Sequence, residues 1–323
     1  MSSTPAIVLV AGPTASGKSE FAESLSEHIG GEILNADSQQ FYRGFDIGTG
    51  KVSPERRRAP HWLLDVCEPG ARMTAMDFAR RAGDLIAEIS ARGKVPILVG
   101  GTGLYFKALL EGLDELPPRD PALRASLQEE FLVKGGEFLH RRLAELDPLS
   151  AQGIHPQDPL RLVRYLEIAL LTGRPPSALM RRHRPSELRY PTHSYWLRPD
   201  REVLKRRIAE RVAAMLREGW LEEVRGLMQS GLDLDRIENR PIGYSELARV
   251  VEGRRELASV QAEIVRKTQQ YAKRQETFFR GLFAHPAYRQ GGSVLTELPP
   301  ELIHSQFPDF KREISTTSGD LGR

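Results

Sequence analysis

AIVLVAGPTASGKS, residues 6–19, joins an apolar run to a glycine-rich loop. The run at 6–11 predicts a buried strand, and the residues from Lys18 to about Ile29 are typical of a helix. Between them, Gly12–Ser19 fits the pattern G-x-x-x-x-G-K-[ST] at every position. Loops of this kind turn their backbone N–H groups toward phosphate oxygens, and the following helix adds its positive N-terminal end.

The loop therefore predicts a site for a di- or triphosphate, of the kind found in nucleotide-binding and ATP-binding proteins. Lys18 supplies a mobile cation, and Ser19 offers a hydroxyl to a magnesium ion. The alternative is a glycine-rich turn that binds nothing, and the flanking strand and helix argue against it. The residues expected to hold the phosphates are Gly12, Pro13, Thr14, Ala15, Ser16, Gly17, Lys18 and Ser19.

Farther along the chain, strand and helix patterns alternate with short turns. Glu32–Leu34 is typical of a second strand, about Ala75–Arg92 of a helix, and Val95–Val99 of a third buried strand. Alternation of this kind predicts an α/β fold, with a parallel sheet covered by helices.

The pattern changes near Leu116. Residues 120–146 are helical, and a further helix has Asp158 as its cap, Pro159 in its first position and Gly173 just past its end. A strand at Ser194–Leu197 then returns to the sheet. We therefore expect an inserted helical domain at 117–193, within a core made of 1–116 and 194–290. Helices are expected at 200–228 and 257–279, and the tail at 291–323 is expected to be loosely ordered.

Composition is that of an ordinary globular protein of 323 residues, with 40% hydrophobic and 28% charged residues and a net charge of +3. Cys67 is the one cysteine, so no internal disulfide can form, which suits a reducing cytoplasm. The sequence has no apolar stretch of about 18 residues and no signal-peptide pattern at its start. We expect a cytoplasmic monomer that does not bind membranes.

Polar residues follow two of the expected strands. Asp37, Ser38, Gln39 and Gln40 come after the second, and Gly100–Tyr105, with Thr102, after the third. The carboxyl ends of neighbouring parallel strands share one rim with the phosphate loop, so a carboxylate and a hydroxyl are expected beside the phosphates. The alternatives are a helix N-cap for Asp37 and a tight strand-to-helix turn at Gly100–Tyr105. The third strand ends without an acidic residue, which argues against nucleotide hydrolysis.

Six stretches together resemble the tRNA dimethylallyltransferase family over about residues 6–283. They are GPTASGKS at 12–19, DSQQFYRGFDIGTGK at 37–51, GGTGLYFKALLEGL at 100–113, HPQDPLRLVRYLEIALLTGRPPS at 155–177, RPIGYSEL at 240–247 and QQYAKRQETFFR at 269–280. The resemblance implies that the loop grips dimethylallyl diphosphate, with Mg²⁺, rather than a nucleotide. The implied acceptor is the N6 amine of the adenosine 3′ to the anticodon, flipped out of its stack, in tRNAs reading codons that begin with U.

The family implies catalytic roles for Asp37, Thr102, Lys18 and Arg211. Asp37 suits a general base, because the adenine amine is a poor nucleophile. Lys18, the loop amides and magnesium suit the departing diphosphate. Thr102 is expected near the bridging oxygen or the amine, and Arg211 on the diphosphate, with Arg206 and Arg207 as neighbouring candidates.

For the tRNA anticodon stem-loop, the family implies contacts from several segments. Arg161 and Arg164 are three residues apart on one helix, so they share a face that suits phosphates, with Leu162, Val163, Leu166 and Leu170 packed away from it. A solvated face is the alternative. The full expected set is Asp37, Ser38, Gln39, Gln40, Thr102, Arg124, Leu160, Arg161, Leu162, Val163, Arg164, Arg240, Gly243, Tyr244, Lys273, Arg274, Gln275 and Arg280.

The chain departs from the family pattern at Ser19, where threonine is commoner, at Phe278, where tryptophan is usual, and at Ser245, where a basic residue is frequent. It also lacks the C-terminal zinc finger of the eukaryotic relatives. Two other classes remain open. A small-molecule or nucleotide kinase would use the same loop with ATP, and a non-catalytic RNA-binding module would bind tRNA without forming product. Adenylate isopentenyltransferases share the donor, but the helical insertion favours tRNA.

Overall fold

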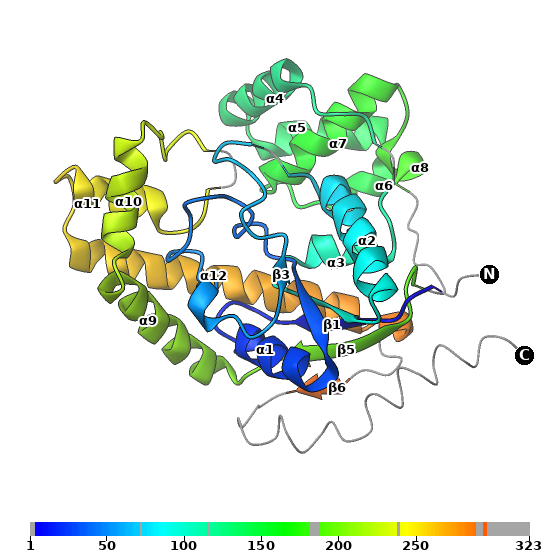
Figure 1. Cartoon of the computed structure of the whole chain (residues 1–323). Coiled ribbons are helices and arrows are strands. Elements are labelled where there is room, and N and C mark those ends of the chain that lie inside the picture. Colours follow the sequence, from blue (N-terminus) through cyan, green and yellow to red (C-terminus); the bar gives the residue numbers. More distant parts are fainter. Residues whose placement is uncertain are drawn as a thin grey trace, which may run out of the picture. The chain divides into compact units, whose positions relative to one another are not determined.

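A computed structural model describes residues 4–71, 73–114, 116–180, 188–237, 240–288 and 293–295. The chain divides into two compact units (Figure 1). One comprises Met1–Gly112 with Ser186–Arg323, and the other is Leu113–Pro185. They are described separately below.

The larger unit is built on a six-stranded parallel sheet. Its strands are β1 (Ile7–Ala11), β2 (Gly31–Asn35), β3 (His61–Trp62), β4 (Val95–Gly100), β5 (Thr192–Leu197) and β6 (Ser293–Leu295). They lie in the order β3-β2-β4-β1-β5-β6, and every pair is parallel. The predicted parallel α/β fold is confirmed. The two edge strands, β3 and β6, were not predicted.

Helices cover both faces of this sheet, as the fully buried β1 requires. Ile7, Leu9 and Ala11 pack with α2 (Ala75–Ala91), α3 (Gly103–Leu110) and α12 (Leu257–Phe283) on one face. Val8 and Val10 pack with α1 (Lys18–Ile29) on the other. A single strand thus supplies alternate side chains to two cores, and its carboxyl end opens into the glycine-rich loop.

Beyond the sheet, α9 (Arg201–Arg217), α10 (Trp220–Gln229) and α11 (Tyr244–Val251) share a third core with the N-terminal half of α12. The sequence predicted one helix over 200–228, and that prediction is wrong. Gly219 has a φ of 104°, a left-handed conformation that ends α9 and starts α10 in a new direction. The turn puts Trp220 inside the unit, where it is 2% exposed.

The smaller unit is all-helical, with α4 (Pro121–Lys134), α5 (Gly136–Leu146), α6 (Pro148–Ala151), α7 (Pro159–Thr172) and α8 (Pro176–Leu179). The predicted limits of α7 are confirmed, because the Asp158 side chain accepts from the Arg161 N–H and Gly173 is left-handed. Leu162, Val163 and Leu166 lie in the core of this unit. Leu170 does not, since it is 39% exposed.

The predicted tail at 291–323 lies outside the described residues apart from β6. The short 3₁₀ helices are Pro54–Arg56 and Pro286–Tyr288. In the described parts of the chain, no helix combines the length and the apolar character that crossing a bilayer requires.

Candidate active site

The glycine-rich loop between β1 and α1 has the backbone of an anion cradle. Ala15 and Gly17 both adopt positive φ, 61° and 90°, and α1 starts directly after Gly17. Successive left-handed and right-handed residues turn neighbouring N–H groups toward one point. The Ser16 hydroxyl is buried and has no hydrogen-bond partner among the described residues. The loop therefore has the backbone shape of an anion-binding site, and the Ser16 hydroxyl is available to bind the anion.

Lys18 is the buried cation of this loop. Its Nζ donates to the Pro13 carbonyl at 3.3 Å. Burial lowers the pKa of Lys18 from 10.5 to about 8, Asp37 raises it, and Arg211 lowers it. An ammonium held in this way is poorly compensated, so a phosphate ligand would stabilise its charged form.

The affinity for inorganic diphosphate is expected to depend on the charge of Lys18. Binding favours the protonated lysine, so affinity is full below about pH 8 and falls up to roughly tenfold per pH unit above it. Titration calorimetry from roughly pH 6.5 to roughly pH 9.5, a range that brackets the transition, measures this dependence. The Lys18→Met variant, titrated in parallel, removes the ligand's own protonation from the comparison. A profile identical in both proteins would contradict the assignment.

Ser19, the predicted magnesium ligand, is exposed in the first turn of α1. The described residues contain no group of three or more His, Cys, Asp or Glu side chains arranged for a metal. Magnesium retains several waters and is commonly bound by one or two protein groups with substrate phosphates. The residues present therefore fit a magnesium ion held chiefly by a diphosphate, with Ser19 as its protein ligand.

Asp37 lies in a tight turn after β2 rather than at the start of a helix, so it is not a helix N-cap. Its Oδ1 accepts from the Gln39 N–H at 3.0 Å. Asn35, which is 5% exposed, holds the turn by accepting from the Asp37 N–H and donating to the Leu63 carbonyl. Asn35 was not predicted from the sequence. The turn fixes the carboxylate, and leaves its second oxygen for another partner.

Thr102 joins the end of β4 to this turn. Its N–H donates to the Ala36 carbonyl at 3.2 Å, and its hydroxyl accepts from the Ser38 N–H at 3.0 Å. A Cβ on Gly100 would lie 2.2 Å from the Ala36 oxygen, so only glycine permits this approach. The three strand ends are therefore brought together, and Thr102 and Asp37 belong to one hydrogen-bonded unit.

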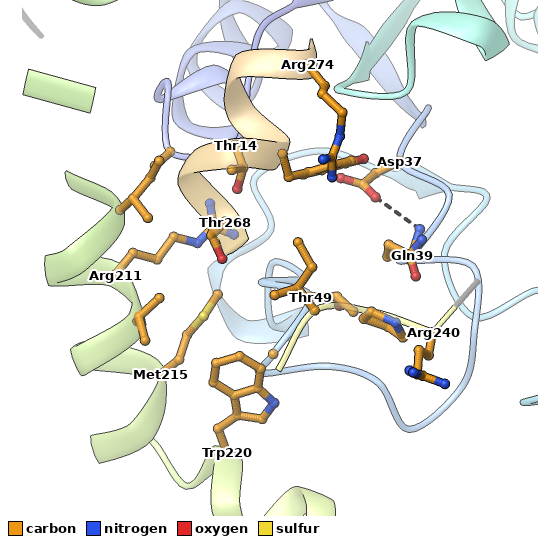
Figure 2. A pocket seen from close by; sticks show the side chains of 17 residues that line it. Thr14, Asp37, Gln39, Thr49, Arg211, Met215, Trp220, Arg240, Thr268 and Arg274 are labelled. Atoms are coloured by element: carbon orange, nitrogen blue, oxygen red, sulfur yellow. Dashed lines mark hydrogen bonds between the residues drawn. The ribbon is translucent and has the colours of Figure 1, made fainter. Parts of the chain in front are cut away.

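A cavity of about 280 Å³ opens beside these residues. Figure 2 shows Asp37, Thr14 and Arg274 at one end, and Met215 and Trp220 at the other. The residues that line it are Thr14, Ala15, Asp37, Gln39, Gly48, Thr49, Ile208, Arg211, Val212, Met215, Trp220, Arg240, Pro241, Ile242, Thr268, Tyr271 and Arg274. The cavity is therefore polar beside the phosphate loop and apolar at Met215 and Trp220, and Arg240 lines another side of it.

Arg211 reaches this cavity from α9 (Figure 2). Burial lowers its pKa, and Asp37 raises it. A Cβ on Gly50 would lie 1.8 Å from Nη2 of Arg211, so Gly50 makes room for the guanidinium. The neighbouring candidate Arg206 has a side chain 68% exposed and faces Glu210 instead. The geometry therefore selects Arg211 as the cation beside Lys18 and Asp37.

Trp220 closes the apolar end of the cavity. Added Cβ atoms on Gly48 and Gly243 would lie 2.1 Å and 2.3 Å from its ring, so both glycines give it space. Glu223, one turn later on α10, accepts from the N–H groups of three consecutive residues, Asp46, Ile47 and Gly48, and from the Tyr244 hydroxyl. This carboxylate holds the loop at 46–48 against the tryptophan. Neither residue was predicted from the sequence.

The model of a known family, IPP transferase, matches residues 40–282. The chain belongs to the IPP transferase family. It is 46% identical to a tRNA dimethylallyltransferase of Geobacter sulfurreducens over 275 residues, 85% of this chain and 88% of that protein. It is 48% identical to one of Geobacter metallireducens, over 85% and 89% of the two chains.

Solved structures of relatives support the same family assignment. The full-length tRNA isopentenylpyrophosphate transferase of Bacillus halodurans matches with a TM-score of 0.67 and 31% identity, over 98% of this chain and 99% of that one. A eukaryotic dimethylallyltransferase acting on tRNA matches with a TM-score of 0.71 and 25% identity, over 97% and 78% of the two chains. The family resemblance drawn from the six sequence stretches is thereby confirmed.

The arginines that the IPP transferase resemblance assigned to RNA have different surroundings in the helical unit. Arg124 and Arg164 both bind Glu167, at 3.0 Å and 2.7 Å, and the Glu167 side chain is fully buried. Arg164 also donates to the Pro117 carbonyl. Arg161 is 64% exposed and only loosely paired with Asp158, at 3.6 Å. Arg161 thus has a charge available for a partner, whereas the other two stabilise their own unit.

Four of the residues expected to contact RNA are buried, which contradicts that prediction for their side chains. Leu162 and Val163 are 0% and 1% exposed in the helical core, so their side chains have no surface for RNA. Tyr244 is fully buried with its hydroxyl on Glu223, and Gln275 is 5% exposed. Leu160, by contrast, is 72% exposed. A segment match between family members cannot separate outward-facing residues from the core residues between them.

The remaining expected RNA contacts lie in the larger unit. Arg240, Gln39 and Arg274 line the cavity, and the Gln39 Oε1 is buried with no partner among the described residues. Lys273 and Arg280 line a second cavity, of about 830 Å³, between α9 and α12. Gly243 packs on Trp220, and Gln40 donates to the carbonyls of Thr49 and Gly50. Of these residues, only Arg240, Gln39 and Arg274 line the cavity that Asp37 lines.

Arg161→Ala is expected to weaken tRNA binding and to reduce its salt dependence, because one phosphate contact would be lost. The slope of log K against log salt should fall by about 1. Filter binding of unmodified tRNA at several salt concentrations measures the slope. Arg254→Ala, which removes a side chain 72% exposed on the larger unit, is the matched control. An unchanged slope in Arg161→Ala would refute the contact.

Proposed function

We propose that this chain transfers a dimethylallyl group from dimethylallyl diphosphate to the N6 amine of the adenosine 3′ to the anticodon in tRNA. One observation carries the proposal: a phosphate loop, a carboxylate and a partly buried arginine meet in one cavity with an apolar end. The membership of the IPP transferase family, and relatives named tRNA dimethylallyltransferase, support the same reaction.

In the proposed reaction, the adenine N6 attacks the C1 carbon of the donor and the C1–O bond to the diphosphate breaks. The amine loses a proton as the new carbon–nitrogen bond forms. We assign that proton to Asp37, and the turn that Asn35 and the Gln39 N–H fix around its carboxylate supports the assignment. Thr102 is bonded to the same turn, which supports a role for it near the reacting groups.

The leaving diphosphate gains negative charge, which the loop is arranged to stabilise. Lys18 is buried and Arg211 is partly buried next to Asp37, and their cations gain a partner when the diphosphate binds. Magnesium, held by the diphosphate and Ser19, would supply further positive charge. The apolar end of the cavity, with Val212, Met215 and Trp220, suits the hydrocarbon part of the donor.

A kinase function is not favoured, because the relatives over most of the chain are transferases of another kind. The structure adds a reason, since β4 ends in the loop that holds Thr102 rather than in an acidic residue. A non-catalytic RNA module gives no account of a buried lysine and a partly buried arginine around Asp37.

The decisive experiment is transfer of labelled dimethylallyl from its diphosphate to unmodified tRNA, with magnesium and without ATP. Label on the adenosine 3′ to the anticodon is the expected result. Absence of transfer, combined with ATP consumption on a small acceptor, would overturn the proposal. Binding of tRNA without any product would favour a non-catalytic RNA module instead.

A further inference from the structure

Gln275 on α12 connects the two loops of the active site. Its Oε1 accepts from the Thr14 N–H in the phosphate loop at 2.9 Å. Its Nε2 donates to the Gly101 carbonyl, at the end of β4, at 3.0 Å. The side chain is 5% exposed, so these bonds are shielded from water. One amide thus joins two loops that are far apart in the sequence.

The surroundings of Gln275 are built around this contact. A Cβ on Gly101 would lie 2.2 Å from Nε2 of Gln275, so a glycine is needed for the approach. Tyr271, one turn earlier on α12, lies close to both Gln275 and Thr102, and burial raises the pKa of its hydroxyl while these two residues lower it. The amide of glutamine offers an acceptor and a donor on two separate atoms at its end, and asparagine, with the same amide, is one methylene shorter.

We infer that Gln275 is a positioning residue that fixes the phosphate loop relative to the Thr102 loop, and hence the donor relative to Asp37. The inference rests on the proposed donor site. Gln275 touches neither reacting group in this scheme. It acts through Thr14, whose N–H it engages, and through Gly101, next to Thr102. This role replaces the RNA contact expected for Gln275 from the sequence.

The same contact limits which amides can hold the diphosphate. The Thr14 N–H is engaged by Gln275, and the Ser16 N–H donates to the Pro13 carbonyl at 3.2 Å. The loop must therefore hold its ligand through its other N–H groups, Lys18 and the Ser16 hydroxyl. Loss of Gln275 would leave the Thr14 N–H without its partner and let the loop drift from that arrangement.

The test is a double-mutant cycle between Gln275→Ala and Gly101→Ala. Each single variant is expected to raise the Kd of inorganic diphosphate and to lower kcat at saturating donor and tRNA, each by roughly tenfold. Gly101→Ala acts by pushing the Gln275 amide away, so the double variant should be no worse than Gln275→Ala alone. Calorimetry with inorganic diphosphate and single-turnover transfer give the two readouts.

Two variants keep the test decisive. Gln275→Met fills the same space without hydrogen bonds, and replaces Gln275→Ala if that protein does not fold. Gln261→Ala removes another glutamine from α12, far from both loops, and should change neither quantity. The inference would be overturned if the effects of the two single substitutions multiplied in the double variant. It would also be overturned if kcat and Kd were unchanged in Gln275→Met, and both outcomes would leave the donor site intact. A wild-type chain that bound no inorganic diphosphate would overturn both.

Discussion

Replacing Asp37 with alanine is expected to lower the rate of dimethylallyl transfer by about 10²-fold or more while donor binding is retained. The carboxylate would be the only group in the proposed reaction that removes the amine proton. In the proposed site, diphosphate is bound by the loop, Lys18 and Arg211, which the substitution leaves in place. Single-turnover transfer measures the rate, and calorimetry with inorganic diphosphate at about pH 7, below the Lys18 transition, measures binding.

Asp37→Asn is the matched control for this prediction. The asparagine side chain retains an oxygen for the Gln39 N–H, so the turn is kept and only the basicity is lost. Both variants should be similarly slow. Normal transfer in either one would sink the assignment of Asp37 as the general base, and a slow alanine variant beside a normal asparagine variant would assign the loss to the turn instead.

Lys18→Met is expected to raise the stability of the protein and to lower its affinity for diphosphate. The pKa of about 8 in place of 10.5 corresponds to about 3 kcal/mol against the charged, buried lysine. Methionine carries no charge to bury, so the variant should melt at a higher temperature than the wild type. Its affinity for inorganic diphosphate should fall by about 10²-fold, because the main cation of the loop is gone.

The sign of the stability change can be checked by pH. Between about pH 8 and 10.5 the unfolded wild type keeps the lysine proton while the folded state loses it, so wild-type stability rises with pH. The advantage of Lys18→Met should therefore shrink over that range. Lys51→Met is the contrasting control. Lys51 is also buried but binds Asp46 and Asp65, so its loss should lower the melting temperature at neutral pH. Equal diphosphate affinity in wild type and Lys18→Met would contradict the role of Lys18.

Much of the fold follows from local sequence signals. The apolar run at 6–11, the loop before α1, and the cap residues Asp158 and Gly173 each act within a few residues, and the strand and helices that they predicted are confirmed. The break at Gly219 was missed, because an isolated glycine within a helical pattern is often tolerated. Whether such a residue is left-handed depends on packing, in this case the burial of Trp220 next to it.

For the site, topology predicted the meeting of Asp37, Thr102 and the phosphate loop on one rim. The parts that bind them together could not be predicted. Asn35, Glu223 and Gln275 act through contacts with distant segments, and polar side chains of these types are mostly exposed in proteins. The same limit affected α12, where the sequence does not say which polar residues turn inward. On α7, helical spacing did predict that Leu162, Val163 and Leu166 pack inward.

The carboxylate of Glu223 makes the stretch 46–48 more than an ordinary surface turn. Three of its amide hydrogens are bonded to a side chain that belongs to α10, and Tyr244 on α11 shares that acceptor. Exchange of these amides with solvent is therefore expected to require a break in their contact with α10. The wall of the cavity at Gly48 and the helices behind it consequently form one cooperative unit of unfolding, although they lie far apart along the chain.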